Sequence, residues 1–144
     1  MASSATPYVW SLILSFAALL ISIILLYAAR FSARLEVKDL AALRSMFDRF
    51  PAWGKRASWA QQNSFEAFSL HAPAALLALV AALQTGALPT VAVGAALLQP
   101  LLRLIYIAAY VGNVPPARGL CWASALLCTG VLYTEALRAL LQAT

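Results

Sequence analysis

Four long apolar segments constrain this chain more than any other feature of its sequence. They cover approximately residues 8–29, 56–83, 88–111 and 118–141. A run of about 20 apolar residues is long enough to cross the hydrocarbon core of a bilayer as an α-helix. Backbone groups in lipid must be hydrogen-bonded internally, so such segments are expected to be helical. We therefore predict an all-α membrane protein, with residues 1–144 forming a single bundle of four transmembrane helices.

The amounts and the placement of charge agree with that class. Only 10% of the residues are charged and 63% are hydrophobic, whereas soluble domains carry about 25% charged residues. A net charge of +5 could suggest a nucleic-acid partner. Most of the basic residues, however, fall in one stretch between apolar segments: Arg30, Arg34, Lys38, Arg44, Arg49, Lys55 and Arg56. Under the positive-inside rule this marks residues 30–55 as a cytoplasmic loop, with both termini across the membrane and no nucleic acid bound.

Apolar residues recur at loosely helical spacing inside this loop. They are Leu35, Leu40, Leu43, Met46 and Phe47. Such a pattern favours an amphipathic helix lying in the membrane interface and ending near Pro51 and Gly54.

Small residues and prolines mark the middle two segments. Ala74, Ala78 and Ala82 repeat at four-residue spacing, a pattern that lets neighbouring helices approach closely. Pro73 and Pro100 lie inside predicted helices. Both can be tolerated, because neighbouring helices can satisfy the carbonyl groups that a proline leaves without a donor.

Polar residues inside the apolar segments need an explanation, since a charge in hydrocarbon costs at least about 2.5–3.5 kcal/mol. The second segment carries Gln61, Gln62, Asn63, Glu66 and His71, and the third carries Gln99, Arg103, Tyr106 and Tyr110. At about 100° per residue, the four residues of the third segment fall within an arc of about 60°. We expect this polar stripe to face protein or a wet cavity rather than lipid.

Depth in the membrane links the second and third segments. At about 1.5 Å per residue, Glu66 lies about 15 Å from the cytoplasmic end of the second segment, and Arg103 lies about 13 Å from the cytoplasmic end of the third. We expect the two to form an ion pair, because a lone buried charge would be strongly disfavoured. Such a pair could serve only to fix the register of two helices. Tyr106, Tyr110 and Arg118 continue the stripe to the cytoplasmic rim, however, which favours a binding site for an anionic, water-soluble molecule.

The remaining polar and sulfur-containing residues have simpler interpretations. Glu135 and Arg138 are three residues apart, which favours an interfacial ion pair. His71 has no set of metal ligands around it in sequence, so we expect a hydrogen-bonded core histidine and no metal site. Cys121 and Cys128 are about 10 Å apart along one helix, too far for a disulfide, and are expected to be buried.

Two motifs in this pattern resemble a known family, the MAPEG superfamily of membrane-associated proteins in eicosanoid and glutathione metabolism. Arg56-Ala57 followed by Asn63-x-x-Glu66 opens the second segment. The third segment carries Arg103-x-x-Tyr106-x-x-x-Tyr110, with Arg118 beyond it. The resemblance covers nearly the whole chain, and its most specific part is the Arg-Ala…Asn-x-x-Glu motif.

The resemblance implies a homotrimer that binds glutathione as co-substrate between adjacent subunits near the cytoplasmic side. By position, Arg118 would be the catalytic arginine that stabilises the glutathione thiolate. The residues that would contact or organise glutathione are Gln61, Asn63, Glu66, Arg103, Tyr106 and Tyr110. The activity implied is that of a glutathione S-transferase-like enzyme, a transferase or peroxidase acting on lipophilic electrophiles that enter from the bilayer.

Three positions depart from the pattern of that family. Trp59 stands where glutathione-binding members often have arginine, and Ala67 stands where some have tyrosine. Gly119 follows Arg118, where the prostaglandin-forming branch has serine. The chain therefore resembles the bacterial members more than the eicosanoid synthases, and a bacterial inner membrane is the expected location.

Three functions fit these residues. The favoured one is glutathione-dependent transfer or peroxidation. The alternative is a non-catalytic bundle of the same fold, in which Glu66 and Arg103 are only a structural pair. A small transporter or proton relay would use the same buried polar residues, although a single conducting path is hard to build from this stripe alone.

Overall fold

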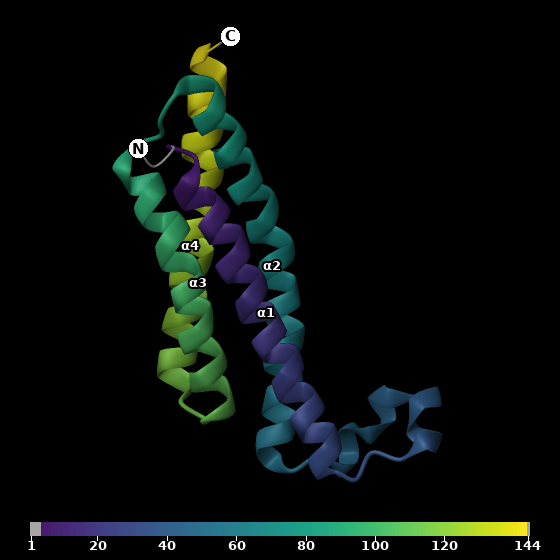
Figure 1. Cartoon of the computed structure of the whole chain (residues 1–144). Helices are drawn as coiled ribbons and strands as arrows, with labels where there is room; N and C mark the ends of the chain where they lie inside the picture. Colours follow the sequence, from purple (N-terminus) through teal and green to yellow (C-terminus); the bar gives the residue numbers. More distant parts are fainter. Residues whose placement is uncertain (1–3, 144) are drawn as a thin grey trace.

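A computed structural model describes residues 4–143, which form four long helices joined by one long loop and two short turns (Figure 1). The helices are α1 (Thr6–Ser32), α2 (Ala52–Thr85), α3 (Thr90–Val111) and α4 (Pro115–Ala143). The α1–α2 loop and the α3–α4 turn lie at one end of the bundle, here called the loop end. The described ends of the chain and the α2–α3 turn lie at the other, here called the terminal end.

All four helices are long and apolar enough to cross a membrane. Three extend a few residues beyond the predicted segments, and α2, with 34 residues, is about 51 Å long. Because a hydrocarbon core is about 30 Å thick, the ends of α2 reach into the interfaces. The exception is α3, which begins two residues later than predicted, because Pro89 has an extended backbone that precedes the first helical turn.

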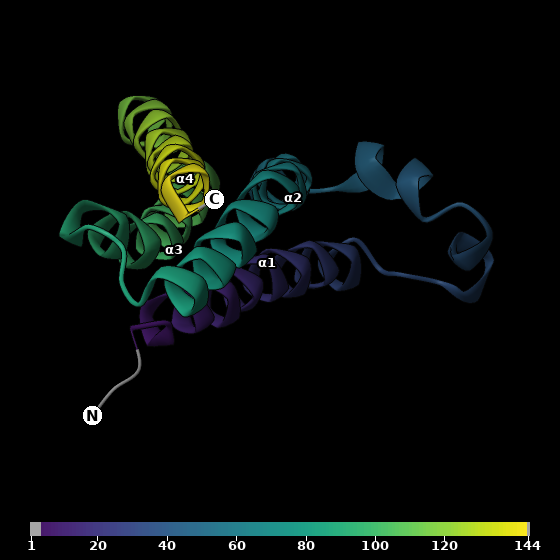
Figure 2. The ribbon, with the colours of Figure 1, turned by 90° about the horizontal axis from the view of Figure 1, so that it is seen from above.

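Alanine-rich helix faces form the centre of the bundle. Figure 2 shows α1 beside α2 and α3 beside α4, seen along the helices. The predicted alanine stripe of α2 is fully buried and packs with Tyr8 of α1 and Leu132 of α4. Because alanine has the smallest apolar side chain, these helix backbones can approach closely, as the four-residue spacing predicted.

The loop between α1 and α2 is not the single amphipathic helix that its apolar spacing favoured. It contains two short 3₁₀ helices, η1 (Val37–Ala41) and η2 (Leu43–Arg49), which Figure 1 shows extending sideways from the bundle. Ala42 interrupts them with a backbone conformation outside the helical range. The loop packs against the bundle, because Met46 of η2 lies in a buried cluster with Leu26 and Ala29, which are within two turns of the end of α1.

Gly54 brings the start of α2 close to the end of α1. A methyl group at this position would lie 2.9 Å from the side chain of Ala29. Glycine therefore allows the two helices to converge at the loop end, where η2 packs against them.

Candidate functional site

The polar stripe predicted for α3 faces the interior of the protein. Gln99, Arg103 and Tyr106 are all at least 96% buried, and Tyr110 is partly buried. The Arg103 guanidinium lies 4.1 Å from the centre of the Tyr106 ring, and the Tyr106 and Tyr110 rings are 5.5 Å apart. Arg118, at the start of α4, lies 4.5 Å above the Tyr110 ring. The stripe is thus a ladder of stacked arginines and tyrosines that leads from the membrane core to the loop end.

The expected ion pair between Glu66 and Arg103 is wrong. One Arg103 nitrogen donates hydrogen bonds to Asn63 Oδ1 at 3.1 Å and to Ser64 Oγ at 3.4 Å. Among residues 4–143, Arg103 forms no salt bridge. Glu66 is exposed and instead accepts a hydrogen bond from Gln62 at 3.3 Å. Rise per residue placed Glu66 and Arg103 at similar depths, but it did not give the side of α2 on which Glu66 lies. Asn63 and Ser64 lie on the side of α2 that contacts Arg103.

A cavity of about 170 Å³ lies between α2, α3 and α4 and is here called the bundle cavity. Asn63, Glu66, Gln99, Arg103 and Thr129 give it a polar side. The rest of its wall is apolar, with Ala67, Leu70, Trp122, Ala125 and Leu126. Three of the residues that the sequence predicted as ligand-binding, Asn63, Glu66 and Arg103, therefore meet at one cavity.

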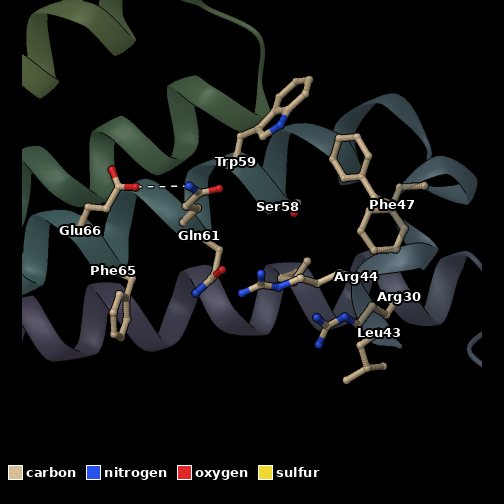
Figure 3. A pocket seen from close by; sticks show the side chains of 12 residues that line it. Arg30, Leu43, Arg44, Phe47, Ser58, Trp59, Gln61, Phe65 and Glu66 are labelled. Carbon is tan, nitrogen blue, oxygen red and sulfur yellow. Dashed lines mark hydrogen bonds between the residues drawn. The ribbon is translucent and has the colours of Figure 1, made fainter. Parts of the chain in front are cut away.

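A larger cavity of about 650 Å³ lies where α1, η2 and α2 meet, and is here called the loop cavity (Figure 3). Its polar lining comes from Arg30, Arg44, Ser58, Gln61, Gln62 and Glu66, and its apolar lining from Leu26, Leu43, Phe47, Phe50, Trp59 and Phe65. In Figure 3 the guanidinium groups of Arg30 and Arg44 lie across the cavity from Glu66 and Trp59 of α2. Gln61, predicted as a ligand-binding residue, lines this cavity rather than the bundle cavity.

Glu66 lines both cavities, which makes them neighbouring parts of one polar surface at the loop-end half of the bundle. Glu66 is exposed, and it shares the bundle cavity with Arg103 and the loop cavity with Arg30 and Arg44. The predicted residues Tyr106, Tyr110 and Arg118 line neither cavity. They stack in a row between Arg103 and the loop end, and Tyr106 contacts the Arg103 guanidinium directly.

Sequence reasoning missed Arg30 and Arg44 as site residues. Both were counted as loop charges that set orientation in the membrane. Both are far in sequence from the Asn-x-x-Glu motif, so helical spacing could not relate them to it. In the structure η2 packs against α1 and places Arg44 at the cavity. Arg30 stacks on Tyr27 at 4.6 Å, and its Nε is buried without a hydrogen-bond partner among the described residues.

Arg56, the first residue of the Arg-Ala motif, has a structural role. Its Nε donates a hydrogen bond of 2.9 Å to the carbonyl oxygen of Val111, the last residue of α3. The final carbonyl groups of a helix lack partners within that helix, and a cation there also interacts favourably with the helix dipole. Arg56 thus joins the start of α2 to the end of α3 at the loop end of the bundle.

The departures Trp59 and Ala67 lie in the linings of the two cavities. Trp59 lines the loop cavity and packs against Phe47, with 5.6 Å between the ring centres. Ala67 lines the bundle cavity, where a small side chain leaves space. Trp59 stands where glutathione-binding members often have arginine. At the cavity that it lines, this chain has two arginines from other positions, Arg30 and Arg44.

The remaining polar residues largely follow the sequence predictions. His71 is fully buried and hydrogen-bonded to Ser11 and Thr129, as expected of a core histidine. Arg138 and Glu135 form an ion pair of 2.9 Å. Cys121 and Cys128 are both free and buried.

The fold and the buried polar site define an integral membrane protein built as a four-helix bundle. The family model described as MAPEG family matches residues 8–138, which is nearly the whole chain. The chain therefore belongs to the MAPEG family. Neither a curated protein nor a solved structure matches it.

Proposed function

We propose that this protein is a membrane-bound glutathione-dependent transferase or peroxidase that acts on lipophilic electrophiles. Glutathione would be held between adjacent subunits of a homotrimer near the cytoplasmic face, which we assign to the loop end. The observation that carries the proposal is Arg103: a buried guanidinium with no carboxylate partner among the described residues, on the wall of a cavity.

An unpaired buried charge needs compensation from its surroundings. Asn63, Ser64 and the Tyr106 ring solvate Arg103 in part, but none of them carries a negative charge. An anionic ligand in the bundle cavity would supply the missing charge and form charge-assisted hydrogen bonds, which are stronger than neutral ones. The arrangement therefore favours a role in binding over a purely structural one.

The charges of the two cavities suit glutathione, which carries two carboxylates, one ammonium group and a thiol. Arg30 and Arg44 at the loop cavity and Arg103 at the bundle cavity are available to the carboxylates. Glu66 stands between them as a partner for the ammonium group. The loop cavity, at about 650 Å³, is within the range of about 300–1,000 Å³ typical of small-molecule sites.

Both cavities open on the outer surface of a single chain, so that one copy leaves a bound ligand partly exposed. A second copy packed against this surface would close them. The homotrimer that the family resemblance implies would supply that copy. The exposed apolar side chains around the bundle, among them Phe65, Leu70 and Leu126, would then be covered by a neighbouring subunit or by lipid.

Arg118 is the residue that we assign to thiol activation. A thiol of pKa about 8.5 is mostly protonated at neutral pH, and a nearby guanidinium favours the thiolate. Arg118 stacks on Tyr110, and its N–H groups bond to no acceptor among the described residues. The thiol proton would pass to water at the loop end. The thiolate sulfur would then bond to the electrophilic carbon as the leaving group departs with the bonding electron pair.

The alternative, a non-catalytic bundle held by a Glu66–Arg103 pair, loses its specific support because that pair does not form. A non-catalytic protein of this fold would not conjugate glutathione to an electrophile, and turnover therefore discriminates between the two functions.

The test uses the purified protein in lipid nanodiscs. Calorimetry would measure glutathione binding, ultraviolet absorbance would measure the thiolate, and conjugation of a chlorodinitrobenzene electrophile would measure turnover. We expect Arg118→Ala to retain binding but to lose the thiolate signal and at least about tenfold in kcat, equivalent to about 1.4 kcal/mol. Arg138→Ala, at the terminal end, is the matched control. Absence of wild-type binding at millimolar glutathione, or equal turnover by Arg118→Ala and wild type, would overturn the proposal.

A further inference from the structure

A chain of hydrogen bonds runs through the interior of the bundle, from Thr129 at the bundle cavity to Ser11 of α1. At its centre is His71, the only histidine of the chain. Its Nε2 lies 2.9 Å from Ser11 Oγ of α1, and its Nδ1 lies 3.1 Å from Thr129 Oγ1 of α4. Of these three residues, Thr129 lines the bundle cavity.

The direction of the first hydrogen bond follows from Pro100. Proline has no N–H, so the carbonyl of Ala96, four residues earlier in α3, lacks its usual helical donor. Ser11 Oγ lies 2.6 Å from that carbonyl oxygen. This distance is that of a hydrogen bond, and because a carbonyl oxygen has no proton, Ser11 must be the donor. The hydroxyl of Ser11 has only one proton. Ser11 therefore donates to Ala96 and accepts from His71, which places the imidazole proton on Nε2.

The direction of the second hydrogen bond follows from the first. A neutral imidazole with its proton on Nε2 has an acceptor at Nδ1. The Thr129 hydroxyl is the donor within reach of it, at 3.1 Å. The same hydroxyl can also donate to the Ala125 carbonyl, 3.2 Å away, but that carbonyl already accepts the backbone N–H of Thr129 within helix α4, whereas Nδ1 has no other donor among the described residues. The single proton of Thr129 is thus directed at His71, and the oxygen presents only lone pairs elsewhere.

We propose that Thr129 is a specificity-determining residue of the bundle cavity, acting as a fixed hydrogen-bond acceptor with His71 as its positioning residue. The Arg103 guanidinium, which lines the same cavity from α3, offers only donors. The cavity therefore selects the end of a ligand that combines an anionic or carbonyl acceptor, placed at Arg103, with an N–H, O–H or S–H donor, placed at Thr129. An apolar chain end or an ester, which has no donor, leaves Thr129 without a partner.

This inference rests on the proposed function for the identity of the ligand, but not for the direction of the hydrogen bonds. The direction can be measured without a ligand, because a single histidine gives one ¹⁵N signal from each ring nitrogen. In histidine-labelled protein in nanodiscs, we expect a protonated Nε2 and an unprotonated Nδ1 shifted by an accepted hydrogen bond. In Thr129→Val, Nδ1 should move to the position of a free acceptor, and Thr129→Ser should restore it. A proton on Nδ1 in the wild type would overturn the inference.

Glutathione titration tests the consequence for the ligand. Loss of one net hydrogen bond, worth about 0.5–1.5 kcal/mol, should raise the Kd of Thr129→Val about two- to twelvefold. Thr129→Ser should bind as the wild type does. The control is Thr134→Val, whose hydroxyl is exposed and bonds to carbonyl groups of its own helix. Equal affinities for wild type and Thr129→Val would overturn the inference while leaving the proposed function intact. A wild type that binds no glutathione would overturn the proposed function, and the ¹⁵N signals would still decide the direction of the bonds.

Discussion

At the scale of single residues, Glu66 and Arg103 have separate roles. Arg103 is held by Asn63, Ser64 and the Tyr106 ring, whereas Glu66 stands exposed between the two cavities. The two side chains line the same cavity, but no ion pair or hydrogen bond joins them. A carboxylate that is not needed to neutralise a buried charge is free to meet a ligand, and its removal should therefore affect binding rather than folding.

The substitution Glu66→Gln tests this separation. Because, among residues 4–143, only Gln62 donates a hydrogen bond to the carboxylate, the free energy of unfolding should change by less than about 0.5 kcal/mol. The Kd for glutathione should rise about tenfold or more, since hydrogen bonds to charged groups contribute about 1.5–3 kcal/mol. Denaturation in mixed detergent and calorimetry would measure the two quantities, with Glu135→Gln as the control for binding. A large loss of stability without a change in Kd would restore a structural role for Glu66.

A second prediction at this scale concerns Ser11 and Pro100. Ser11→Ala removes the donor to the Ala96 carbonyl and the acceptor for His71, and should cost about 1–2 kcal/mol of unfolding free energy. In a Pro100→Ala background the restored N–H can bond to Ala96, so the same substitution should cost less. A double-mutant cycle measured by unfolding in detergent isolates this coupling. Equal costs in the two backgrounds would show that Pro100 is not the reason for the Ser11 hydrogen bond.

At the scale of elements, the loop between α1 and α2 is a folded unit that carries Arg44 to the site. Its 3₁₀ helices are held by the cluster of Leu26, Ala29, Met46 and Phe50 and by an ion pair of 2.6 Å between Arg49 and Asp39. Asp39 also accepts a hydrogen bond from the backbone N–H of Glu36 at 2.9 Å. The position of Arg44 therefore depends on interactions distributed over the whole loop.

The ion pair makes the order of the loop depend on pH. The hydrogen bond from Arg49, followed by that from the Glu36 backbone, lowers the pKa of Asp39 below its ordinary value of 3.8. A lowered pKa means that the stabilisation is fully present above about pH 3.8 and is lost as the pH falls through the folded-state pKa. Amide hydrogen exchange over residues 36–42 should accelerate in that acid range, after correction for intrinsic rates. Asp39→Asn should show faster exchange at neutral pH and no acid transition. A wild-type loop whose protection is constant down to pH 2 would contradict this account.

At the scale of the whole molecule, the two cavities of one chain are expected to meet complementary cavities of neighbouring copies. The loop cavity depends on α1 and η2, and the bundle cavity depends on α3 and α4, so each can be disabled by itself. Arg44→Ala would disable the first and Arg103→Met the second. Each variant alone should be inactive in conjugation.

Coexpression of the two variants tests whether one site uses two copies. If the loop cavity of one subunit and the bundle cavity of the next form a single site, each mixed ring of three subunits should regain one of its three sites, which is about one third of the sites in mixed rings and about one quarter when unmixed rings are counted. Activity and the composition of purified mixed trimers, separated by two affinity tags, would measure this. If both halves come from the same chain, no mixture regains activity. A coexpressed pair of Arg103→Met variants carrying the same two tags controls for recovery caused by tagging.

The local features of the site could be predicted because a helix fixes them. The period of the helix placed Gln99, Arg103, Tyr106 and Tyr110 on one buried face. Rise per residue placed Glu66 and Arg103 at the same depth, but it could not give the direction of Glu66 around α2, and the expected pair was wrong. Arg44 was missed because it is far from the site in sequence. Only the packing of η2 on α1 brings it to the loop cavity.

The sequence by itself determined the four apolar helices, the concentration of basic residues at one end and the polar stripe on α3, because each depends on composition or on helical periodicity. Only the tertiary structure decided that Asn63 and Ser64 hold Arg103, that Arg30 and Arg44 share a cavity with Glu66, and that Ser11 bonds to the carbonyl freed by Pro100. Those contacts depend on which helices are neighbours and on how each is rotated about its own axis. The apolar surface of a membrane helix leaves that rotation open until the helices pack.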